Sequence, residues 1–420
     1  MRKTRVLLLT QWFDPEPTFK GLLFAQELVK LGFEVEVLTG FPNYPGGKVY
    51  PGYRIRLIQR ERIGEVSITR VPLYPSHSGS VIGRVANYLT FSLCAALYGV
   101  LVAKRPDVIY SYHPPLTTGF TAVAIRLARG VPVVCDIQDL WPDTLRATGM
   151  TRNQRVLRMI GCACDWFYRR VERLTVLSPG FKRMLVSRGV PESKIEVIYN
   201  WADEAALAAG ARQSSVSLPP GGLRVLFAGN LGRAQGLDAV LSAARLLLDR
   251  GSRAQLVFLG SGVEVEELKA RTAQLRLSNV HFLPAVPMSE VGAYLAAAEV
   301  LLVHLLPDEL FRITIPSKTQ AYMAAGKPIV MGVDGDAADL VVRSGGGIVV
   351  QSGSEESIAD GIARMEAMSA EIRASMGDRA KSFYEAELSI GVGTQRFAKI
   401  FTELATQRSS APAPADGGSR

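Results

Sequence analysis

Apolar residues along this chain follow two alternating patterns. Short apolar runs predict β-strands, and longer stretches with apolar residues at every third or fourth position predict amphipathic helices, as at Leu22–Leu31 and Leu116–Arg129. This alternation predicts an α/β fold with parallel sheets. In the first half the predicted strands are Val6–Thr10, Val35–Thr39, Val108–Ser111, Val131–Cys135, Leu174–Leu177 and Ile195–Ile198, with Arg54–Gln59 and Val66–Val71 as an inserted strand pair.

The pattern breaks at residues 203–222, which are rich in Ala, Ser, Gly and Pro, and it then restarts. Such a composition is typical of a linker. We therefore predict two Rossmann-like, doubly wound domains facing a cleft, at 1–202 and 223–385. Ligands of such sheets bind beyond the carboxyl ends of the strands. The second-half strands are predicted at Leu223–Ala228, Gln255–Leu259, Val280–Leu283, Val300–Val303, Pro328–Met331 and Gly347–Val350.

The C-terminal region predicts a long helix over Ser369–Gln407 with an interruption near Ser389–Gly393. We expect residues 386–408 to return to the N-terminal domain. The tail 409–420 is low in complexity and is predicted to be disordered.

The uncharged segment Val85–Ala103, between Arg84 and Lys104, is by length a borderline membrane-spanning candidate. Its polar residues, Asn87 among them, favour a buried core helix. A helix that touches the membrane with one face is the alternative. Thr151–Arg173, which carries six arginines from Arg152 to Arg173 between apolar residues, is a second candidate for contact with anionic lipid or for an ordinary solvated helix.

The formal charge of +9 and the pI near 9.4 favour anionic partners. Zinc-finger spacing, an RNA-recognition signature and dense basic tracts are all missing, so nucleic acid is not expected. Four cysteines in apolar surroundings predict free thiols in a reducing compartment. The first apolar run is too short for a signal peptide, and we expect a cytoplasmic protein.

A glycine-rich turn, Phe227-Ala-Gly-Asn-Leu-Gly-Arg-Ala-Gln-Gly236, follows the first strand of the second half and precedes a helix. Its glycines allow backbone N–H groups to approach a phosphate at the helix N-terminus, although an ordinary turn would have the same composition. A second small-residue turn, Gly260-Ser-Gly262, follows the next strand. A third helix start, at Pro316-Ser-Lys318, offers a hydroxyl and a cation to an anion.

Two residues of the first half lie at the corresponding carboxyl edge. His113 follows the strand Val108–Ser111, and Asp139 follows Val131–Cys135. His113 could contact a bound ligand or be a loop histidine. Asp139 could accept a proton from a hydroxyl, or it could cap a helix or pair with Arg146.

Together these segments resemble the retaining glycosyltransferases of GT-B fold usually numbered family 4, which include many enzymes of bacterial capsule, O-antigen and exopolysaccharide synthesis. The resemblance extends to about residue 405, and two of its segments are similar to those of aminosugar transferases such as N-acetyl-fucosamine transferases. It is carried by Asp14-Pro-Glu-Pro, Asp139-Leu-Trp-Pro-Asp143, Ser178-Pro-Gly-Phe181, Ile198-Tyr-Asn-Trp-Ala-Asp203, the Gly229–Gly236 turn, Gly260-Ser-Gly262, and Pro316-Ser-Lys318 through Gly326-Lys-Pro328.

The resemblance implies transfer of a sugar, expected to be an N-acetylated aminosugar, from a UDP-sugar to a polyprenyl-diphosphate-linked glycan, with retention of configuration and no cofactor. It makes His113, Asp139 and Lys318 the candidate catalytic residues. The implied acceptor-side residues are Asp14, Glu16, Lys20 and Gly21. The implied donor-binding residues are Gly229, Asn230, Gly232, Arg233, Gln235, Gly260, Gly262, Phe282, Leu283, Pro316, Ser317 and Gln320.

The chain also departs from the family pattern. Ile313 and Ala321 stand where the family often has two glutamates, so the usual ribose contact would fall to Glu309 or Gln320. Asn230 and Gln235 stand where the family has Arg and Lys. The diphosphate charge would then be met mainly by Lys318, with Arg233 and backbone N–H groups.

No metal is expected, because Asp334-Gly-Asp336 has the spacing of a metal motif but resembles a loop after a strand. Two alternatives stay open: a sugar-nucleotide epimerase of GT-B fold, and a non-catalytic nucleotide-sugar-binding protein. We expect peripheral contact with the anionic inner face of the cell membrane, where a lipid-linked acceptor would lie.

Overall fold

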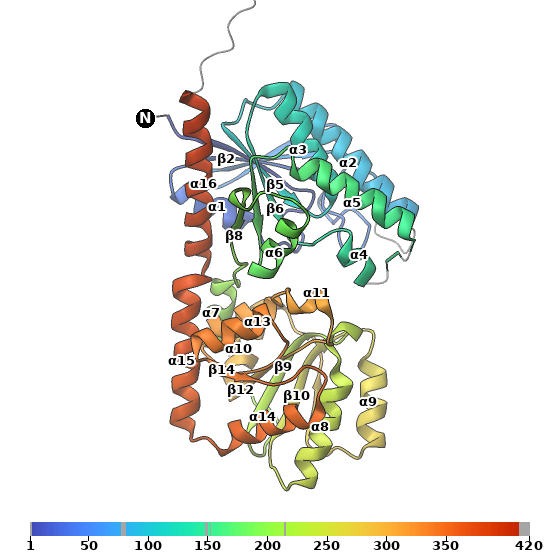
Figure 1. Ribbon diagram of the computed structural model, residues 1–420, viewed down its shortest axis with the longest axis vertical. Coiled ribbons are helices and arrows are strands. Elements are labelled where there is room, and N and C mark those ends of the chain that lie inside the picture. The colour runs from blue at the N-terminus through green and yellow to red at the C-terminus, as the bar shows by residue number, and fades with distance from the viewer. Residues whose placement is uncertain (1, 77–80, 148–149, 152, 214–215, 411–420) are drawn as a thin grey trace, which may run out of the picture. The chain divides into compact units, whose positions relative to one another are not determined.

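The computed structural model describes residues 2–76, 81–147, 150–151, 153–213 and 216–410. The chain forms two compact units, each with its own sheet (Figure 1). The first comprises Met1–Leu177, Lys182–Ile198 and Thr394–Arg420, and the second comprises Ser178–Phe181 and Tyr199–Gly393. The predicted fold class, with two parallel-sheet α/β domains, is confirmed.

The first unit contains an eight-stranded sheet in the order β3-β4-β2-β1-β5-β6-β7-β8. Neighbouring strands are parallel except for β3 and β4. β1 pairs with β2 on one side and β5 on the other, so the strand order reverses beside it, which is where doubly wound sheets bind ligands. The strands are β1 (Arg5–Leu9), β2 (Glu34–Gly40), β3 (Gln59–Ile63), β4 (Val66–Val71), β5 (Val108–His113), β6 (Val133–Ile137), β7 (Arg173–Val176) and β8 (Ile195–Val197).

Helices cover both faces of this sheet. Figure 1 shows α2, α3 and α5 on one face, with α1 and α16 on the other. The helices are α1 (Leu22–Lys30), α2 (Val81–Leu101), α3 (Leu116–Arg129), α4 (Asp143–Ala147), α5 (Gln154–Tyr168), α6 (Pro179–Ser187), the short η1 (Glu192–Lys194) and α16 (Ile390–Ser410).

Aromatic packing holds the C-terminal helix α16 on the first unit. The Phe397 ring lies 5.2 Å from that of Phe24 and 5.6 Å from that of Tyr110, and Phe401 lies 6.1 Å from Phe33. These edge-to-face contacts add to the free energy gained by burying the rings. Helix α16 therefore packs on the unit that contains the first strand of the chain.

The second unit contains a six-stranded, wholly parallel sheet in the order β11-β10-β9-β12-β13-β14. Its strands are β9 (Arg224–Asn230), β10 (Gln255–Ser261), β11 (Val280–Leu283), β12 (Val300–His304), β13 (Ile329–Gly332) and β14 (Gly347–Val349). Its helices are α7 (Glu204–Gln213), η2 (Arg233–Gln235), α8 (Leu237–Asp249), α9 (Val265–Gln274), α10 (Met288–Ala297), α11 (Glu309–Arg312), α12 (Ser317–Ala324), α13 (Asp336–Ser344), α14 (Glu355–Ala367) and α15 (Ala370–Glu387).

The expected linker 203–222 contains helix α7, which packs against α10. A Cβ added to Gly292 would clash with the carbonyl of Leu207, and one added to Gly210 would meet the carbonyl of Ser289. Small residues therefore serve close helix packing here, whereas their abundance in the sequence suggested a flexible connection.

Three further expectations need correction. The first strand of the inserted pair runs over Gln59–Ile63, not Arg54–Gln59, because its register is set by pairing with β4. Helix α16 continues to Ser410, past the expected start of the tail at residue 409. The rest of the expected tail, 411–420, and Arg152 of the basic segment lie outside the described residues. Segment 85–103 is not a buried core helix: only 28% of the apolar window in Ile82–Leu101 is buried.

Candidate active site

His113 ends β5 at the carboxyl edge of the first sheet. Its side chain is fully buried, and its ring lies 5.8 Å from that of Trp141 in an edge-to-face arrangement. Among the described residues, neither ring nitrogen has a hydrogen-bond partner on another residue. Burial lowers the pKa of His113 to about 4, so the imidazole is neutral near pH 7. It can donate or accept one hydrogen bond without bringing a charge.

Asp139 follows β6 at the same edge and is half-buried. Its carboxylate makes no hydrogen bond or ion pair with any described residue, and Arg146 pairs with Asp143 instead. Desolvation raises the pKa of Asp139. A desolvated carboxylate without a partner can accept a hydroxyl proton or hold sugar hydroxyls.

Asp136, on β6, was not singled out from the sequence, although it interrupts an otherwise apolar strand. It is fully buried, and its Oδ2 lies 2.9 Å from Nζ of Lys20, itself fully buried. Its oxygens also accept hydrogen bonds from Tyr110 at 2.7 Å, Gln138 at 2.6 Å and Thr175 at 2.7 Å. Asp136 therefore ties three strands to the loop after β1.

The loop after β1, which carries the expected acceptor-side residues, is held by its own carboxylates. Oε1 of Glu16 accepts hydrogen bonds from the backbone N–H groups of Asn43 and Tyr44, both at 2.7 Å. Oδ2 of Asp14 accepts from the N–H of Leu22 at 2.7 Å, at the start of α1. An added Cβ at Gly21 would clash with Asp14. With Lys20 paired to Asp136, these four residues fix the shape of the acceptor-side edge.

In the second unit, the glycine-rich turn begins at the end of β9. Gly229 has φ +137°, and Gly236, at the N-terminus of α8, has φ +59°. L-residues with side chains rarely adopt such conformations, so both positions require glycine. No side chain caps α8, and its first N–H groups therefore remain available to an anion.

Lys318, in the first turn of α12, reaches this turn. Its Nζ donates to Oε1 of Gln235 at 2.6 Å and lies 3.6 Å from the centre of the Phe227 ring. It would lie 3.5 Å from a Cβ on Gly229. Desolvation lowers the pKa of Lys318 to about 7. The predicted turn and the predicted cation thus come together within one unit, and they form a phosphate-sized group of donors.

Gly260, near the end of β10, and Gly262, just after it, allow close packing of the backbone. A Cβ on Gly260 would clash with the carbonyl of Gly229, and one on Gly262 with the carbonyl of Leu231. The Leu231 N–H donates to the Ser261 carbonyl at 2.8 Å. These glycines let the two loops pack backbone to backbone, which fixes the conformation of the β9 turn.

The remaining donor-side candidates divide by exposure. Asn230, Arg233 and Ser317 are exposed at the ends of their elements. Phe282 stacks on Phe258 with ring centres 5.4 Å apart and packs against the core of the second unit. Leu283 and Pro316 are half-buried, and Gly232 is buried.

The two suggested substitutes for the missing glutamates differ sharply. Gln320 is buried. In the amide orientation that gives both its oxygen and its nitrogen suitable hydrogen-bond partners, its NH₂ group donates to the carbonyl of Pro316 at 2.8 Å. The Glu309 side chain is 93% exposed. Of the two, only Glu309 therefore has a polar group that is exposed to a ligand.

His304, at the end of β12, is a residue that sequence reasoning missed. Its Nε2 accepts from the Gly353 N–H at 3.1 Å, so Nδ1 carries the proton and donates to the Gln235 carbonyl at 2.6 Å. His304 thereby holds Gln235 in the position where it meets Lys318. In the sequence, the one sign of its role was the position of a histidine at the end of an apolar strand.

Among the described residues, no group of His, Cys, Asp and Glu side chains is arranged to hold a metal ion. Asp336, the second aspartate of Asp334-Gly-Asp336, is buried, and its Oδ2 accepts the Gly180 N–H at 2.6 Å. Its carboxylate serves the packing of the second unit.

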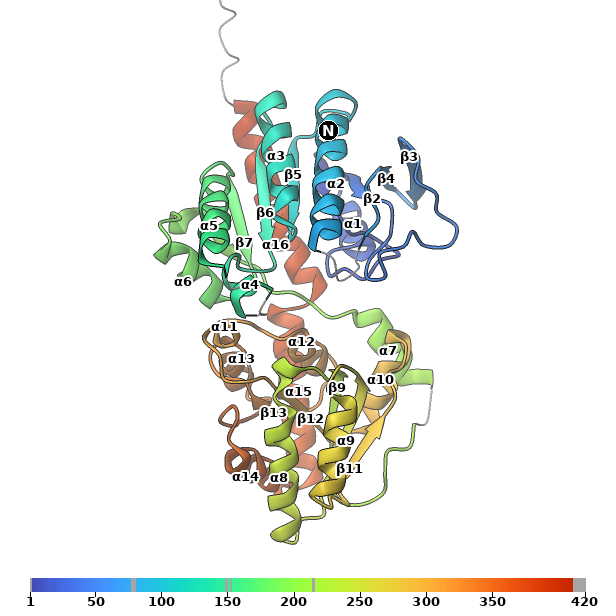
Figure 2. The same ribbon diagram turned by 90° about the vertical axis from the view of Figure 1, so that its right-hand side faces the viewer.

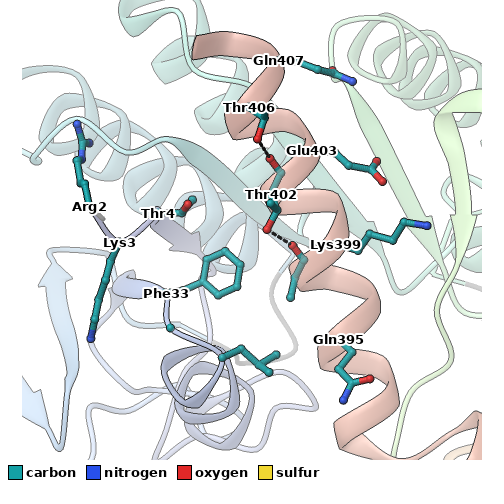
Figure 3. Close-up of a pocket in the computed structure, with 13 residues that line it drawn as sticks. Arg2, Lys3, Thr4, Phe33, Gln395, Lys399, Thr402, Glu403, Thr406 and Gln407 are labelled. Carbon is teal, nitrogen blue, oxygen red and sulfur yellow. Dashed lines mark hydrogen bonds between the residues drawn. The ribbon is translucent and has the colours of Figure 1, made fainter. Parts of the chain in front are cut away.

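A groove of about 870 Å³ lies in the first unit between α16 and the turn before β2 (Figure 3). Thr4 and Phe33 in its lining precede β1 and β2, so it opens at the amino ends of the strands, opposite His113. Two of its basic residues, Arg2 and Lys3, are paired with Asp107 and Glu65. The groove is therefore separate from the candidate site.

Two family models match the chain in succession. Residues 22–201 match the "Glycosyl transferase 4-like domain", and residues 212–383 match the "Glycosyl transferases group 1" domain. A probable glycosyltransferase of Pseudomonas aeruginosa, WbjE, is 28% identical over 54% of this chain and 58% of its own length, so the match spans little more than half of that relative. WcaI of Escherichia coli, a putative colanic acid biosynthesis glycosyl transferase, is 25% identical over 75% of this chain and 79% of its own.

Solved structures agree on the fold. Sucrose-phosphate synthase from Thermosynechococcus elongatus is 15% identical, with a TM-score of 0.69 over 96% of this chain and 100% of its own. HepE of Anabaena, solved with UDP and glucose, is 16% identical, with a TM-score of 0.65 over 95% of this chain and 99% of its own. Since the two domain models together cover most of its length, the chain belongs to the GT-B glycosyltransferases of the family 4 type.

Proposed function

We propose that this protein is a retaining, metal-independent glycosyltransferase that moves a sugar from a UDP-sugar to a lipid-linked glycan in bacterial surface polysaccharide synthesis. The observation that carries the proposal is the position of Lys318, whose ammonium meets the glycine-rich turn at the open N-terminus of α8. This arrangement suits a diphosphate better than any neutral ligand.

The chemistry follows from where charge develops. Cleavage of the sugar–phosphate bond places negative charge on the departing diphosphate and oxocarbenium character on the anomeric carbon. Lys318 and the N–H groups after Gly229 would stabilise the departing charge, which electrostatic preorganisation does most effectively in a dry site. The acceptor hydroxyl would attack on the leaving-group face, so configuration is retained and no covalent enzyme nucleophile is needed.

The first unit would supply the sugar and acceptor contacts. A neutral His113 with unused ring nitrogens is suited to a sugar hydroxyl, since either nitrogen can find its partner there. Asp139 would receive the acceptor proton or hold a hydroxyl. Asp14, Glu16, Lys20 and Gly21 would act through the shape of the edge, because their polar groups are engaged within the fold.

The substrates are proposed from the relatives and from the motifs. WcaI is named for colanic acid synthesis and HepE was solved with UDP, so a surface polysaccharide and a UDP-linked donor are the natural choices here. The Asp139-Leu-Trp-Pro and Pro316-Ser-Lys318 segments favour an N-acetylated aminosugar. A polyprenyl-diphosphate-linked acceptor would place the protein in the cytoplasm, peripheral to the anionic inner face of the membrane.

Incubation of the purified chain with isotope-labelled UDP-sugars and a polyprenyl-diphosphate acceptor tests the proposal. Mass spectrometry should find the labelled sugar on the acceptor and UDP released in equal amount. A donor converted to another sugar nucleotide without acceptor would identify an epimerase. Binding without turnover, for every donor offered, would identify a nucleotide-sugar-binding protein.

A further inference from the structure

Helix α2 presents an outward face made only of aliphatic side chains. The members of this face, here called the α2 stripe, lie three or four positions apart and are between 47% and 83% exposed: Ile82, Val85, Leu89, Leu93, Leu97 and Leu101. Surface helices ordinarily turn polar residues to water. A continuous exposed apolar surface of this kind marks an interaction site.

The opposite face of α2 belongs to the core. Asn87, Phe91 and Ala95 are fully buried, and Tyr98 is 5% exposed. Figure 2 shows α2 flanked by α3 on one side and by β2 and β4 on the other, and α2 contacts all three. The helix is long and apolar enough to span a bilayer, but crossing one would strip this face from the sheet. Its apolar stripe can only be covered from outside.

The charges around the stripe have one sign. Residues 72–106 contain no Asp or Glu, and they carry Arg84, Lys104 and Arg105. The neighbouring helix α3 also has no acidic residue, although Arg126 in its last turn is paired with Glu172. A surface that joins insertable side chains to the cations of residues 72–106 complements an anionic bilayer, whereas a protein partner would need its own apolar groove.

Helix α5 continues this surface beyond α3, as Figure 1 shows. Met159 is 66% exposed and Trp166 36% exposed, and the Arg170 guanidinium lies 4.0 Å from the Trp166 ring centre. Arg158 is exposed one position before Met159. An aromatic ring carrying a cation is typical of side chains at the headgroup level.

The buried face of α2 is joined to the acceptor-side edge by amide side chains. Oδ1 of Asn87 accepts from Nε2 of Gln11 at 2.5 Å, and Nδ2 of Asn87 donates to Oδ1 of Asn43 at 3.1 Å. Gln11 follows β1, and Asn43 lies in the loop that Glu16 holds. The helix that faces outward thus also positions the loops at the carboxyl edge.

We propose that α2 lies along the surface of an anionic membrane, with the α2 stripe inserted at the headgroup–acyl boundary and the α5 side chains beside it. A functional reason for this placement rests on the proposed lipid-linked acceptor. Membrane contact through α2 would bring the carboxyl edge of the first sheet to the depth of a diphosphate headgroup. The surface itself is tested without any reaction.

The experiment measures the partition of the full chain onto vesicles of phosphatidylcholine with and without phosphatidylglycerol. The stripe variant is Leu89→Gln/Leu93→Gln/Leu97→Gln, which keeps good helix formers at exposed positions. The control variant is Met288→Gln/Val342→Gln/Ile372→Gln, which removes three exposed apolar residues from the second unit. Circular dichroism and thermal melting confirm that both variants fold.

We expect the wild type and the control variant to bind phosphatidylglycerol vesicles, to release in high salt, and to bind phosphatidylcholine weakly. The stripe variant should bind at least about tenfold more weakly, since three leucine side chains no longer enter the bilayer. Equal binding by the stripe variant overturns the inference. A second result would also overturn it: light scattering shows that the wild type is a dimer and the stripe variant a monomer, and neither protein binds vesicles.

Failure of the proposed function would look different. Vesicle binding that depends on the stripe, in a protein that transfers no sugar, leaves the membrane surface standing and refutes the transferase. A stripe variant that is slow on vesicle-embedded acceptor but equal to wild type on a water-soluble, short-chain acceptor supports both.

Discussion

Nζ of Lys318 donates a 2.6 Å hydrogen bond to Oε1 of Gln235, which joins the first turn of α12 to the loop between β9 and α8. The partner is a neutral amide, so the hydrogen bond leaves the charge of the protonated amine available to a ligand. His304 holds Gln235 from behind through the Gln235 carbonyl. The cation is therefore positioned by a chain of hydrogen bonds and is not neutralised by a carboxylate.

Donor affinity should depend on pH through Lys318. Desolvation lowers its pKa to about 7, so the free protein loses this proton as pH rises through that value. A bound diphosphate favours the charged form and raises the pKa again, so binding above about pH 7 takes up a proton and weakens as pH increases, by at most about tenfold per pH unit. Calorimetric titration with UDP in buffers of different ionisation enthalpy measures this uptake.

The Lys318→Gln variant is the control, because the titration of UDP itself persists in it. Its proton uptake at pH 8 should be smaller than that of the wild type. Equal uptake by both proteins would mean that Lys318 does not titrate on binding.

Gly260→Ala should destabilise the second unit and weaken donor binding. The new Cβ would clash with the Gly229 carbonyl at a backbone φ of +150°, so the two donor loops would have to separate. The cost should exceed about 1 kcal/mol, the usual limit of glycine-to-alanine effects at permitted positions. Melting temperature and UDP affinity are the measurements.

Gly251→Ala is the matched variant. Gly251 also has a positive φ, of +76°, but nothing lies within 4 Å of its added Cβ. It should lower the melting temperature less and leave UDP affinity unchanged. Similar losses in both variants would show that backbone strain, and not the contact between loops, explains the effect.

Lys20→Met should lower the stability of the first unit by about 3–5 kcal/mol, the cost of leaving a buried charge without its partner. Asp136 would then be a buried carboxylate held only by neutral hydrogen bonds. The double variant Lys20→Met/Asp136→Asn should recover part of the loss. Urea unfolding measures both. A single variant as stable as wild type would place Lys20 outside this network.

The periodicity of apolar residues predicted the parallel sheets well, because buried parallel strands are continuous apolar runs that alternate with helices. Val66–Val71 and Val280–Leu283 were predicted at the bounds that the structure gives. The shift at Gln59–Ile63 was not predictable, because an exposed edge strand has no buried face to reveal its register. Helix α7 was missed because a linker and a closely packed helix pair are both rich in alanine and glycine, so composition does not distinguish them.

The candidate site was predictable to the extent that it follows strand ends. Lys318 and the Gly229–Gly236 turn could be singled out from the sequence because glycine-rich turns and helix starts leave local signals, and the structure places them in contact. Asp136 and His304 were missed because their importance comes from partners distant in sequence, Lys20 and Gln235. Such partners become visible only when the strands are placed side by side.

Chelation of divalent ions should leave the initial rate of sugar transfer unchanged. Fixed donors and Lys318 are proposed to take the role that a metal ion has in other transferases, that of stabilising the leaving diphosphate. The rate is compared before and after treatment with EDTA and again after Mg²⁺ is restored. Strong inhibition that Mg²⁺ reverses would contradict metal independence.

Lys318 is proposed as the principal cation for the departing diphosphate, and the transfer rate of the Lys318→Ala variant measures that role. With Arg233→Ala, whose exposed side chain lies in the same turn, as the comparison, kcat/KM for the labelled UDP-sugar is measured on one acceptor. Lys318→Ala should lose at least about tenfold, equivalent to about 1.4 kcal/mol of transition-state stabilisation, and Arg233→Ala should lose less. A Lys318→Ala enzyme that works at the wild-type rate would show that Lys318 does not stabilise the leaving diphosphate.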